Sequence, residues 1–337
     1  MNALTPLSWL YGAGVAAHRE VRKVPPPQDA HPRIISIGNL EVGGNGKTPL
    51  AIWLLVRALK AGESVAYVSR GYGSNVRSDV VTCVLSRGVV PTTLANLRVL
   101  SDAYALAREI GDEGALVVER VPGVNALFCR DKRRAVRLAA ALGVARVFLD
   151  DAFQSWRVAR HVDIVLLDAE RPLDGAALLP AGRLREKADA LRRANAIVFN
   201  GATTPGEVAG ARAQVARWLT PGVAVAGMAR RIELVHMAGD STRADAFLAV
   251  SGIARPAAFE RSLAQAGVRI AGHEIFADHH RYDAGDLTRI ERRLRASQLT
   301  AVIVTEKDWV KMRRLSPPFD VWVARLEVTL IGDELPV

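Results

Sequence analysis

The stretch "EVGGNGKTPLAI", residues 41–52, decides the fold. A Walker A loop reads G-x-x-x-x-G-K-[ST]: its backbone N–H groups surround phosphates, its lysine reaches the β and γ oxygens, and its hydroxyl meets Mg²⁺. Gly46, Lys47 and Thr48 fit this pattern, whereas Glu41 occupies the position of the first glycine. The stretch therefore indicates a phosphate-binding loop whose opening turn departs from the consensus.

The residues on either side of this loop support the phosphate-binding interpretation. The apolar run 33–38 predicts a strand before the loop, and the pattern of 48–62, with Pro49 in its first turn, predicts a helix after it. Such a strand, turn and helix direct backbone N–H groups and a helix dipole at an anion. A chance glycine-rich turn is the alternative. The predicted nucleotide-binding residues are Gly43, Gly44, Asn45, Gly46, Lys47 and Thr48.

The rest of the chain alternates short apolar runs with helical patterns, which is typical of βαβ units around a parallel sheet. The expected strands are 33–38, 64–69, 80–85, 115–119, 145–150, 163–168 and 196–200. We predict an α/β fold with a P-loop NTPase-like parallel sheet flanked by helices, and a second, smaller α/β domain joined by a two-stranded linker. The expected parts are an N-terminal helix 1–23, a P-loop domain 24–228, linker strands 229–237 and 320–330, and a C-terminal domain 238–316.

Composition limits the classes of protein that this chain could belong to. Its 337 residues are 50% hydrophobic, which suits one large or two medium globular domains. Cys83 and Cys129 lie far apart without a C-x-x-C partner, so the sequence predicts neither a disulfide framework nor a cysteine zinc site, and we expect a cytoplasmic protein. The net charge of +10 favours a polyanionic partner. With 6% aromatic residues and no interleaved basic and aromatic stripe, nucleic acid is disfavoured.

The first 23 residues are apolar first and basic afterwards. On a helix, Leu4, Leu7 and Tyr11 share one face, and three cationic side chains follow near the end, Arg19, Arg22 and Lys23. No run in the chain reaches the roughly 18 to 20 apolar residues that a membrane-spanning helix needs. We therefore expect a helix that lies on a membrane surface; a helix packed on its own domain is the alternative.

A second acidic motif is expected to complete the nucleotide site. Asp150 and Asp151 end the apolar run 145–150, where a carboxylate can hold Mg²⁺ at the edge of a parallel sheet. Thr48 would supply a hydroxyl ligand to the same ion. A helix N-cap or a loop aspartate is the alternative, and the sequence leaves open which aspartate contacts the metal.

Eight segments, in order along nearly the whole chain, resemble the tetraacyldisaccharide 4'-kinase family, the lipid A 4'-kinases of Gram-negative bacteria. They are "IGNLEVGGNGKTP" 37–49, "SRGYG" 69–73, "GDEGAL" 111–116, "FLDDAFQ" 148–154, "LLPAGRLRE" 178–186, "SGIARPAAF" 251–259, "FADHH" 276–280 and "TEKDWVK" 305–311. Each segment alone is a weak signal. Together they are specific, because unrelated P-loop proteins share only the first of them and an aspartate-ending strand.

This resemblance implies a reaction. The family transfers the ATP γ-phosphate to the 4' hydroxyl of a tetraacyl glucosamine disaccharide 1-phosphate. ATP and Mg²⁺ are the implied cofactors, and the implied partners are that anionic acylated disaccharide and the cytoplasmic face of the inner membrane. We expect a monomer that does not bind nucleic acid. By resemblance, Asp112 is the base that takes the acceptor proton, His279 assists it, and Lys47 keeps its usual role.

The resemblance also implies residues that bind the acceptor substrate. They are Arg70, Tyr72, Glu113, Arg185 and Glu186. Plainer interpretations are a turn at "SRGYG", a surface charge pair at the "RE" dipeptide, and a satisfied loop pair or a metal site at the two histidines of "DHH". The "TEKD" segment has the spacing of a helix capping box.

Several positions depart from the family pattern. Ala152, Gly114 and Ser155 replace a usual glycine, proline and histidine, Arg183 replaces a common proline, and His161 replaces a common aspartate. None of these changes removes a group that phosphoryl transfer needs. The competing class is a P-loop ATPase that acts as a nucleotide-driven switch or chaperone, which would need no acceptor base.

Overall fold

The computed structural model describes residues 4–22, 24, 32–43, 46–86, 96–100, 106–173, 177–238 and 243–337. Its helices are α1 (Thr5–Arg22), α2 (Lys47–Lys60), α3 (Leu106–Ile110), α4 (Asp112–Arg120), α5 (Lys132–Ala141), α6 (Pro205–Val215), α7 (Pro256–Gln265), α8 (Ala284–Ala296) and α9 (Glu306–Met312), with short 3₁₀ turns η1 (Ala188–Arg193), η2 (Ala216–Trp218) and η3 (Arg313–Leu315). Its strands are β1 (Arg33–Asn39), β2 (Val65–Ser69), β3 (Val81–Val84), β4 (Leu97–Val99), β5 (Asn125–Phe128), β6 (Arg146–Asp150), β7 (Val162–Asp168), β8 (Ala196–Asn200), β9 (Ala224–His236), β10 (Phe247–Ser251), β11 (Ile270–Ile275), β12 (Ala301–Thr305) and β13 (Asp320–Gly332).

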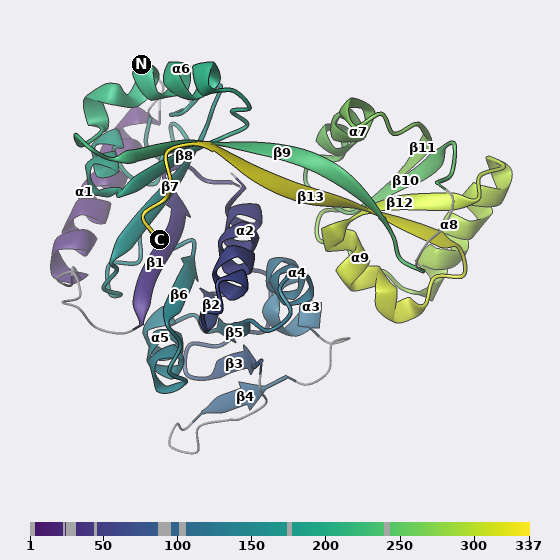
Figure 1. Cartoon of the computed structure of the whole chain (residues 1–337), viewed down its shortest axis with the longest axis horizontal. Helices are drawn as coiled ribbons and strands as arrows, with labels where there is room; N and C mark the ends of the chain where they lie inside the picture. The colour runs from purple at the N-terminus through teal and green to yellow at the C-terminus, as the bar shows by residue number, and fades with distance from the viewer. Residues whose placement is uncertain are drawn as a thin grey trace.

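These strands form one mostly parallel sheet, flanked by helices as the sequence predicts. Within the described residues the strand order is β11-β10-β12-β13-β9-β8-β7-β1-β6-β2-β5-β3-β4. Neighbouring strands are parallel except β13 with β9 and β3 with β5. Figure 1 shows two lobes, which we call the first lobe (the described part of 4–223) and the second lobe (243–319), with β9 and β13 running side by side between them.

The link between the lobes is a long antiparallel pair. Its register runs from Trp322 opposite His236 to Gly332 opposite Ala226, which contains the pairing predicted for 320–330. β9 also pairs in parallel with β8, and β13 pairs in parallel with β12, so each strand of the link continues the sheet of one lobe. The sheet therefore crosses from one lobe to the other without a break.

The phosphate-loop strand and helix lie at the centre of the first lobe. β1 lies between β6 and β7, and its Ile35 and Ile37 are fully buried. On α2 the apolar positions Leu50, Leu54 and Leu55 are buried on the face that covers the sheet, and each contributes about 2 kcal/mol through burial. This packing fixes the start of α2, and with it the position of the residues that precede the helix.

One strand prediction is wrong. The segment 115–119, expected to be a strand, belongs to the helix α4. Gly111 precedes α4 at φ 83°, and Asp112 and Glu113 occupy the first turn, where carboxylates are favourable beside the helix N-terminus. A short apolar run such as Ala115 to Val117 does not distinguish a buried strand from a buried helix face. Here it is the buried face of a helix.

The second lobe is a smaller α/β unit. β10, β11 and β12 are parallel, and Leu248, Val250, Ile290 and Val302 lie in its core. Since the strands are parallel, the segments that follow them leave the sheet at one edge. In the structure this edge faces α4 of the first lobe, and α4 packs against α9.

The N-terminal helix α1 packs on the first lobe through few residues. The Ser8 hydroxyl donates to the Leu178 carbonyl at 2.9 Å and accepts from the Ala181 N–H at 3.1 Å. In contrast, Leu7, Trp9 and Leu10 are 52%, 69% and 71% exposed. Within the described residues no helix combines the length and apolar character needed to cross a bilayer.

Candidate active site

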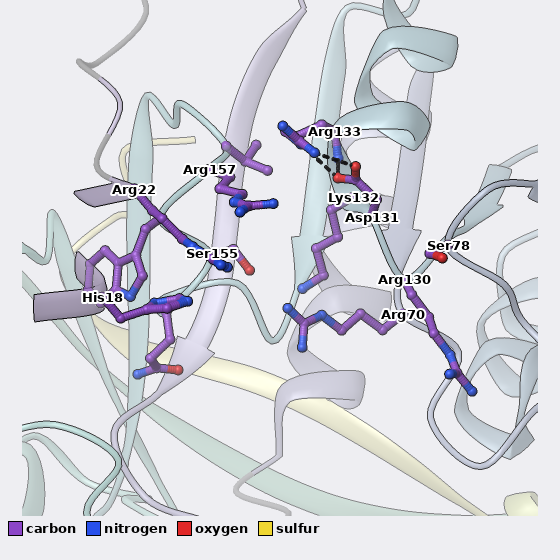
Figure 2. Close-up of a pocket in the computed structure, with 13 residues that line it drawn as sticks. His18, Arg22, Arg70, Ser78, Arg130, Asp131, Lys132, Arg133, Ser155 and Arg157 are labelled. Carbon is purple, nitrogen blue, oxygen red and sulfur yellow. Dashed lines mark hydrogen bonds and ion pairs between the residues drawn. The ribbon is translucent and has the colours of Figure 1, made fainter. Parts of the chain in front are cut away.

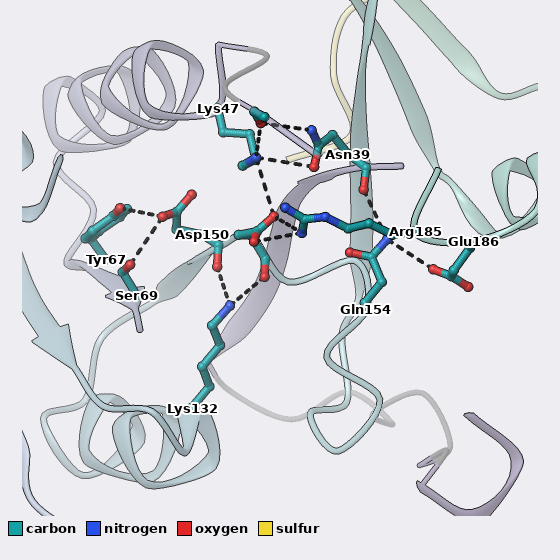
Figure 3. A network of polar contacts seen from close by, with 11 residues as sticks. Asn39, Lys47, Tyr67, Ser69, Lys132, Asp150, Gln154, Arg185 and Glu186 are labelled. Carbon is teal, nitrogen blue, oxygen red and sulfur yellow. Dashed lines mark hydrogen bonds and ion pairs between the residues drawn. The ribbon is translucent and has the colours of Figure 1, made fainter. Parts of the chain in front are cut away.

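The phosphate loop places Lys47 at the start of α2. Gly46 has φ 84°, and a Cβ at this position would approach the Met228 Cε to 2.7 Å, so the turn requires glycine. The Lys47 Nζ lies 3.2 Å from the Asn39 Oδ1 and 3.4 Å from the Gly43 carbonyl (Figure 3). The predicted loop residues Gly44 and Asn45 lie outside the described residues. Lys47 thus lies among oxygen atoms at the mouth of the loop.

The two carboxylate oxygens of Asp150 have different surroundings. It ends β6 directly opposite Ile37 of β1, and its Oδ2 accepts from the Tyr67 hydroxyl at 3.0 Å and the Ser69 hydroxyl at 3.2 Å. Its Oδ1 is buried and has no hydrogen-bond partner among the described residues. Burial raises the pKa of Asp150, and the nearby charge of Glu113 raises it further. A cation would relieve this cost.

Asp151 is engaged by two cations. It has φ 45°, and both carboxylate oxygens accept from the Arg185 Nη1, at 3.0 and 2.9 Å. Its Oδ1 is also 3.4 Å from the Lys47 Nζ. Burial raises the pKa of Asp151, but the charges of Lys47 and Arg185 outweigh burial and lower the pKa below its ordinary value. Asp151 therefore links the "LRE" segment to the phosphate loop.

Lys132 supports this aspartate pair, and sequence reasoning missed it. Its ammonium group donates to the backbone carbonyls of Asp150 and of Asp151, the second at 2.8 Å (Figure 3). The residue is 3% exposed, and burial lowers the pKa of Lys132 to about 8. One signal was available: a lysine in a first helical turn, directly after the N-cap Asp131, opposes the helix dipole.

Thr48 and Glu113 connect the loop to the second lobe. The Lys307 Nζ of α9 lies 2.7 Å from the Glu113 Oε1, and Thr48 lies close enough to Glu113 to contribute to its pKa. Burial raises the pKa of Glu113, but the charges of Lys307 and Lys47 and the proximity of Thr48 together lower the pKa below its usual value. The carboxylate predicted to bind substrate thus lies beside the hydroxyl predicted to bind Mg²⁺.

The same helix carries the predicted base. The Asp112 Oδ2 lies 3.0 Å from the His279 Nδ1, so the residues implied as base and assistant do meet across the two lobes. His279 has φ 58° and a half-exposed side chain. Asp112 and Glu113 are neighbours in the first turn of α4, so the carboxylate and histidine pair and the contact of Glu113 with Lys307 lie at the same end of this helix.

Three of the four remaining predicted substrate residues have different surroundings. Arg185 joins the site through Asp151. Glu186 is buried, and its Oε1 accepts from the Gln154 amide at 3.1 Å and from Arg193 at 3.2 Å. It therefore holds neighbouring side chains in position and is not exposed to a substrate. Tyr72 has an 88% exposed side chain, and its carbonyl lies against Gly111, the residue that precedes Asp112.

A cationic cavity lies beside the aspartate pair and includes Arg70. It encloses about 320 Å³, and Figure 2 shows side chains from α1 and from the first lobe around it. Its positively charged lining residues are Arg22, Arg70, Arg130, Lys132, Arg133 and Arg157, with His18 at the same wall. Among the described lining residues the acidic one is Asp131, whose Oδ2 lies 2.7 Å from the Arg133 Nη2. The cavity therefore suits a phosphorylated ligand.

Two departures from the family pattern have clear positions. Ser155 lines the cationic cavity. Arg183 is tied to the phosphate loop, since its Nη2 donates to the Val42 carbonyl at 2.8 Å and its own carbonyl accepts from the Val42 N–H at 2.9 Å. Arg183 thereby joins the "LLPAGRLRE" segment to the loop without a proline.

The residues fit a divalent cation at Asp150 and Thr48. The unpartnered Oδ1 of Asp150 is the kind of hard oxygen ligand that Mg²⁺ prefers. No group of three or more His, Cys, Asp or Glu residues suited to a metal occurs in the described part of the chain. Of the two histidines of "DHH", His279 meets Asp112, and the His280 Nε2 lies 2.8 Å from the Asp286 Oδ2.

The central strand, the glycine-led helix with its lysine, and the aspartate pair opposite are typical of a P-loop phosphotransferase, and kinases use an aspartate, as Asp112 could serve here, to accept a hydroxyl proton. Comparison with known proteins agrees. The profile of the family described as tetraacyldisaccharide-1-P 4'-kinase matches residues 1–335. The chain belongs to this family and is an ATP-dependent kinase.

Individual relatives cover most of the chain. Tetraacyldisaccharide 4'-kinase of Anaeromyxobacter sp. (strain Fw109-5) is 38% identical over 295 residues, 83% of this chain and 73% of the relative. The protein of the same name from Halorhodospira halophila is 33% identical over 332 residues, 97% of this chain and 88% of the relative. The crystal structure of LpxK from Aquifex aeolicus in complex with ATP superposes with a TM-score of 0.71 at 25% identity, covering 98% of this chain and 94% of that one.

Proposed function

We propose that this protein transfers the γ-phosphate of ATP to the 4' hydroxyl of a tetraacyl glucosamine disaccharide 1-phosphate. The observation that carries the proposal is the pair of Asp112 and His279 at the start of α4, in which the Asp112 Oδ2 lies 3.0 Å from the His279 Nδ1. A switch or chaperone ATPase would have no use for such a base beside its phosphate loop. The names of the homologous proteins support the same reaction.

ATP binds with its phosphates at the loop. The backbone N–H groups around Gly46 and the ammonium of Lys47 would surround the β and γ phosphates. Thr48 and Asp150 would hold Mg²⁺, and Asp151, already shared between Lys47 and Arg185, would hold the cations around it in place. When bound, Mg²⁺ supplies charge neutralisation for the phosphates.

Asp112 acts on the acceptor sugar. The 4' oxygen attacks the γ phosphorus, the new O–P bond forms as the bond to the β-phosphate oxygen breaks, and the hydroxyl proton passes to the Asp112 carboxylate. ADP leaves with the displaced oxygen. His279 contacts the Oδ2 of Asp112, so the proton would pass to the other carboxylate oxygen, Oδ1. Catalysis by this arrangement rests on positioning and charge compensation.

The acceptor reaches the site from a membrane surface. The exposed side chains Leu7, Trp9 and Leu10 of α1 suit the headgroup boundary of a bilayer, and the basic end of α1 contributes His18 and Arg22 to the cationic cavity. We place the phosphorylated sugar head in this cavity, at the cytoplasmic face of the inner membrane. A monomer suffices for this arrangement.

The two lobes are proposed to act as separate domains. The first lobe contributes the phosphate loop and Asp112, and the second contributes His279 and Lys307, with β9 and β13 as the linker. Approach of α9 to α4 then completes the site around the bound substrates.

The test follows the phosphate itself. The full chain is incubated with γ-labelled ATP, Mg²⁺ and a tetraacyl glucosamine disaccharide 1-phosphate in mixed micelles, and the products are separated. Label at the 4' position of the disaccharide supports the proposal, and Lys47→Ala should abolish it while ordered structure persists. Label found only in inorganic phosphate would identify a hydrolase or switch and refute the assignment.

A further inference from the structure

A buried lysine approaches the proposed base from the second lobe. Lys311 of α9 is 6% exposed, and its Nζ lies 3.5 Å from the Asp112 Oδ2 and 3.3 Å from the Asp308 Oδ1. Its ammonium also lies 5.7 Å from the centre of the Tyr282 ring. A buried ammonium group is costly unless its charge is compensated, so this placement between two carboxylates calls for a physical reason.

Asp308 holds this lysine in place. It is fully buried, and its Oδ1 accepts from the Gly252 N–H at 3.0 Å and the Tyr282 hydroxyl at 3.1 Å, while its Oδ2 accepts from the Thr305 hydroxyl at 2.6 Å. Three donors fix the carboxylate, and the lysine supplies its countercharge. The position of Lys311 therefore does not depend on Asp112.

The histidine and the lysine belong to one rigid unit. The Gly252 carbonyl accepts from the His279 N–H at 3.1 Å, and the Gly252 N–H donates to Asp308. A Cβ at position 252 would approach the His280 Cβ to 3.0 Å and the Ala277 carbonyl to 3.1 Å, so glycine allows the two segments to meet. Gly252, which follows β10, therefore connects two segments. One is the segment after β11 that carries His279, and the other is α9, which follows β12 and carries Lys311.

We infer that Lys311 is a positioning residue for Asp112, an inference that rests on the proposed function. His279 and Lys311 both approach the Oδ2 of Asp112, which fixes the rotation of the carboxylate and leaves Oδ1 to receive the acceptor proton. During transfer the hydroxyl proton neutralises Asp112. Lys311 then remains paired with Asp308, so turnover never leaves an uncompensated ammonium in the interior.

The experiment compares Lys311→Met with a matched variant in the full-length protein. We expect Lys311→Met to lower kcat for acceptor phosphorylation by about 10- to 100-fold while KM for ATP and for the disaccharide stay within about threefold. Lys311→Arg should recover most of the loss, because a guanidinium can bridge the same two carboxylates. The control is Arg313→Met, which removes another ion pair between the lobes, with Glu119, but does not touch Asp112.

The outcomes separate positioning from docking of the lobes. The inference requires Arg313→Met to keep kcat within about threefold of the wild-type value. Equal losses in Arg313→Met and Lys311→Met, or a wild-type kcat in Lys311→Met, would overturn it. If Lys311→Met fails to fold, Lys311→Gln gives the same comparison with a neutral donor of similar length. Failure of the wild-type protein to phosphorylate the disaccharide would instead refute the proposed function, and this inference with it.

Discussion

Arg120 forms two ion pairs that link α4 to α9 and to β13, and replacing it should lower the free energy of unfolding. The Arg120 guanidinium pairs with Glu306 at 2.6 Å and with Glu327 at 2.7 Å. Arg120 and Glu306 are each 12% exposed, and Glu327 is 35% exposed. Both pairs are partly buried, so their cost lies between the about 3 to 5 kcal/mol for breaking a buried pair and the up to about 1 kcal/mol of an exposed pair, and Arg120→Met should lower the free energy of unfolding by about 2 to 3 kcal/mol.

Urea unfolding followed by circular dichroism measures this loss. The second variant combines Arg120→Met with Glu306→Gln, which removes the carboxylate charge that Arg120→Met leaves without its partner. Because the two substitutions act on one interaction, the free energy of unfolding of this double variant should be about 1 kcal/mol higher than that of Arg120→Met. The Glu306 Oε2 also accepts from the Leu326 N–H at 2.9 Å, a bond that the amide oxygen of a glutamine side chain can keep. A change below about 0.5 kcal/mol in Arg120→Met, typical of a surface substitution, would show that these pairs do not hold α4 against the second lobe.

Three further predictions concern the site and the N-terminal helix. Asp150→Asn keeps an oxygen that accepts from Tyr67 and Ser69 but removes the negative charge of the carboxylate, so Mg²⁺-dependent phosphorylation should fall about 100-fold or more in steady-state assays. A loss below about threefold would contradict the assignment of Asp150 as a metal ligand. Burial lowers the pKa of Lys132 to about 8 in the folded protein, against an ordinary value of 10.5, so between pH 8 and 10.5 the unfolded chain binds more protons than the folded one. The free energy of unfolding of the wild type, measured in urea, should therefore rise with pH relative to that of Lys132→Met, by up to about 3 kcal/mol. A stability difference between the two proteins that does not change with pH would show that Lys132 has an ordinary pKa. The double variant Trp9→Glu with Leu10→Glu should bind anionic vesicles about tenfold or more weakly in sedimentation assays, whereas the control Val99→Glu, at an exposed site in β4, should bind like the wild type. Equal binding by the wild type and both variants would contradict the membrane role of α1.

Local sequence predicted the elements that carry their own signal. β8 at 196–200 has the predicted bounds, and β1 and α2 are within one or two residues of them, because apolar runs and the glycine turn are local features. The pairing of 320–330 with β9 also followed from two extended patterns. The 115–119 segment was assigned wrongly because its apolar run is short enough for either structure.

The candidate site was predictable in its residue types but not in its electrostatics. The sequence pointed to Asp150 and Asp151 together. Which of them keeps a free oxygen depends on Arg185 and Tyr67, which come from distant segments. Lys132 was missed for the same reason, since its partners are carbonyl groups that no side-chain pattern reveals.

Lys311 shows a further limit of local patterns. "TEKDWVK" indicated a helix start, and Thr305 is indeed the N-cap, accepting from the Asp308 N–H. That pattern explains the threonine and the aspartate. Its lysine acquires a role only when α9 meets α4, an arrangement set by the long pairing of β9 with β13.

The most direct test of the central claim is the rate of acceptor phosphorylation by Asp112→Asn at saturating ATP and disaccharide, with nucleotide affinity measured in parallel. General base catalysis contributes about 100- to 10,000-fold, so kcat should fall by that factor while the Kd for ATP changes less than about threefold. A variant that phosphorylates the 4' hydroxyl at close to the wild-type rate would contradict the account.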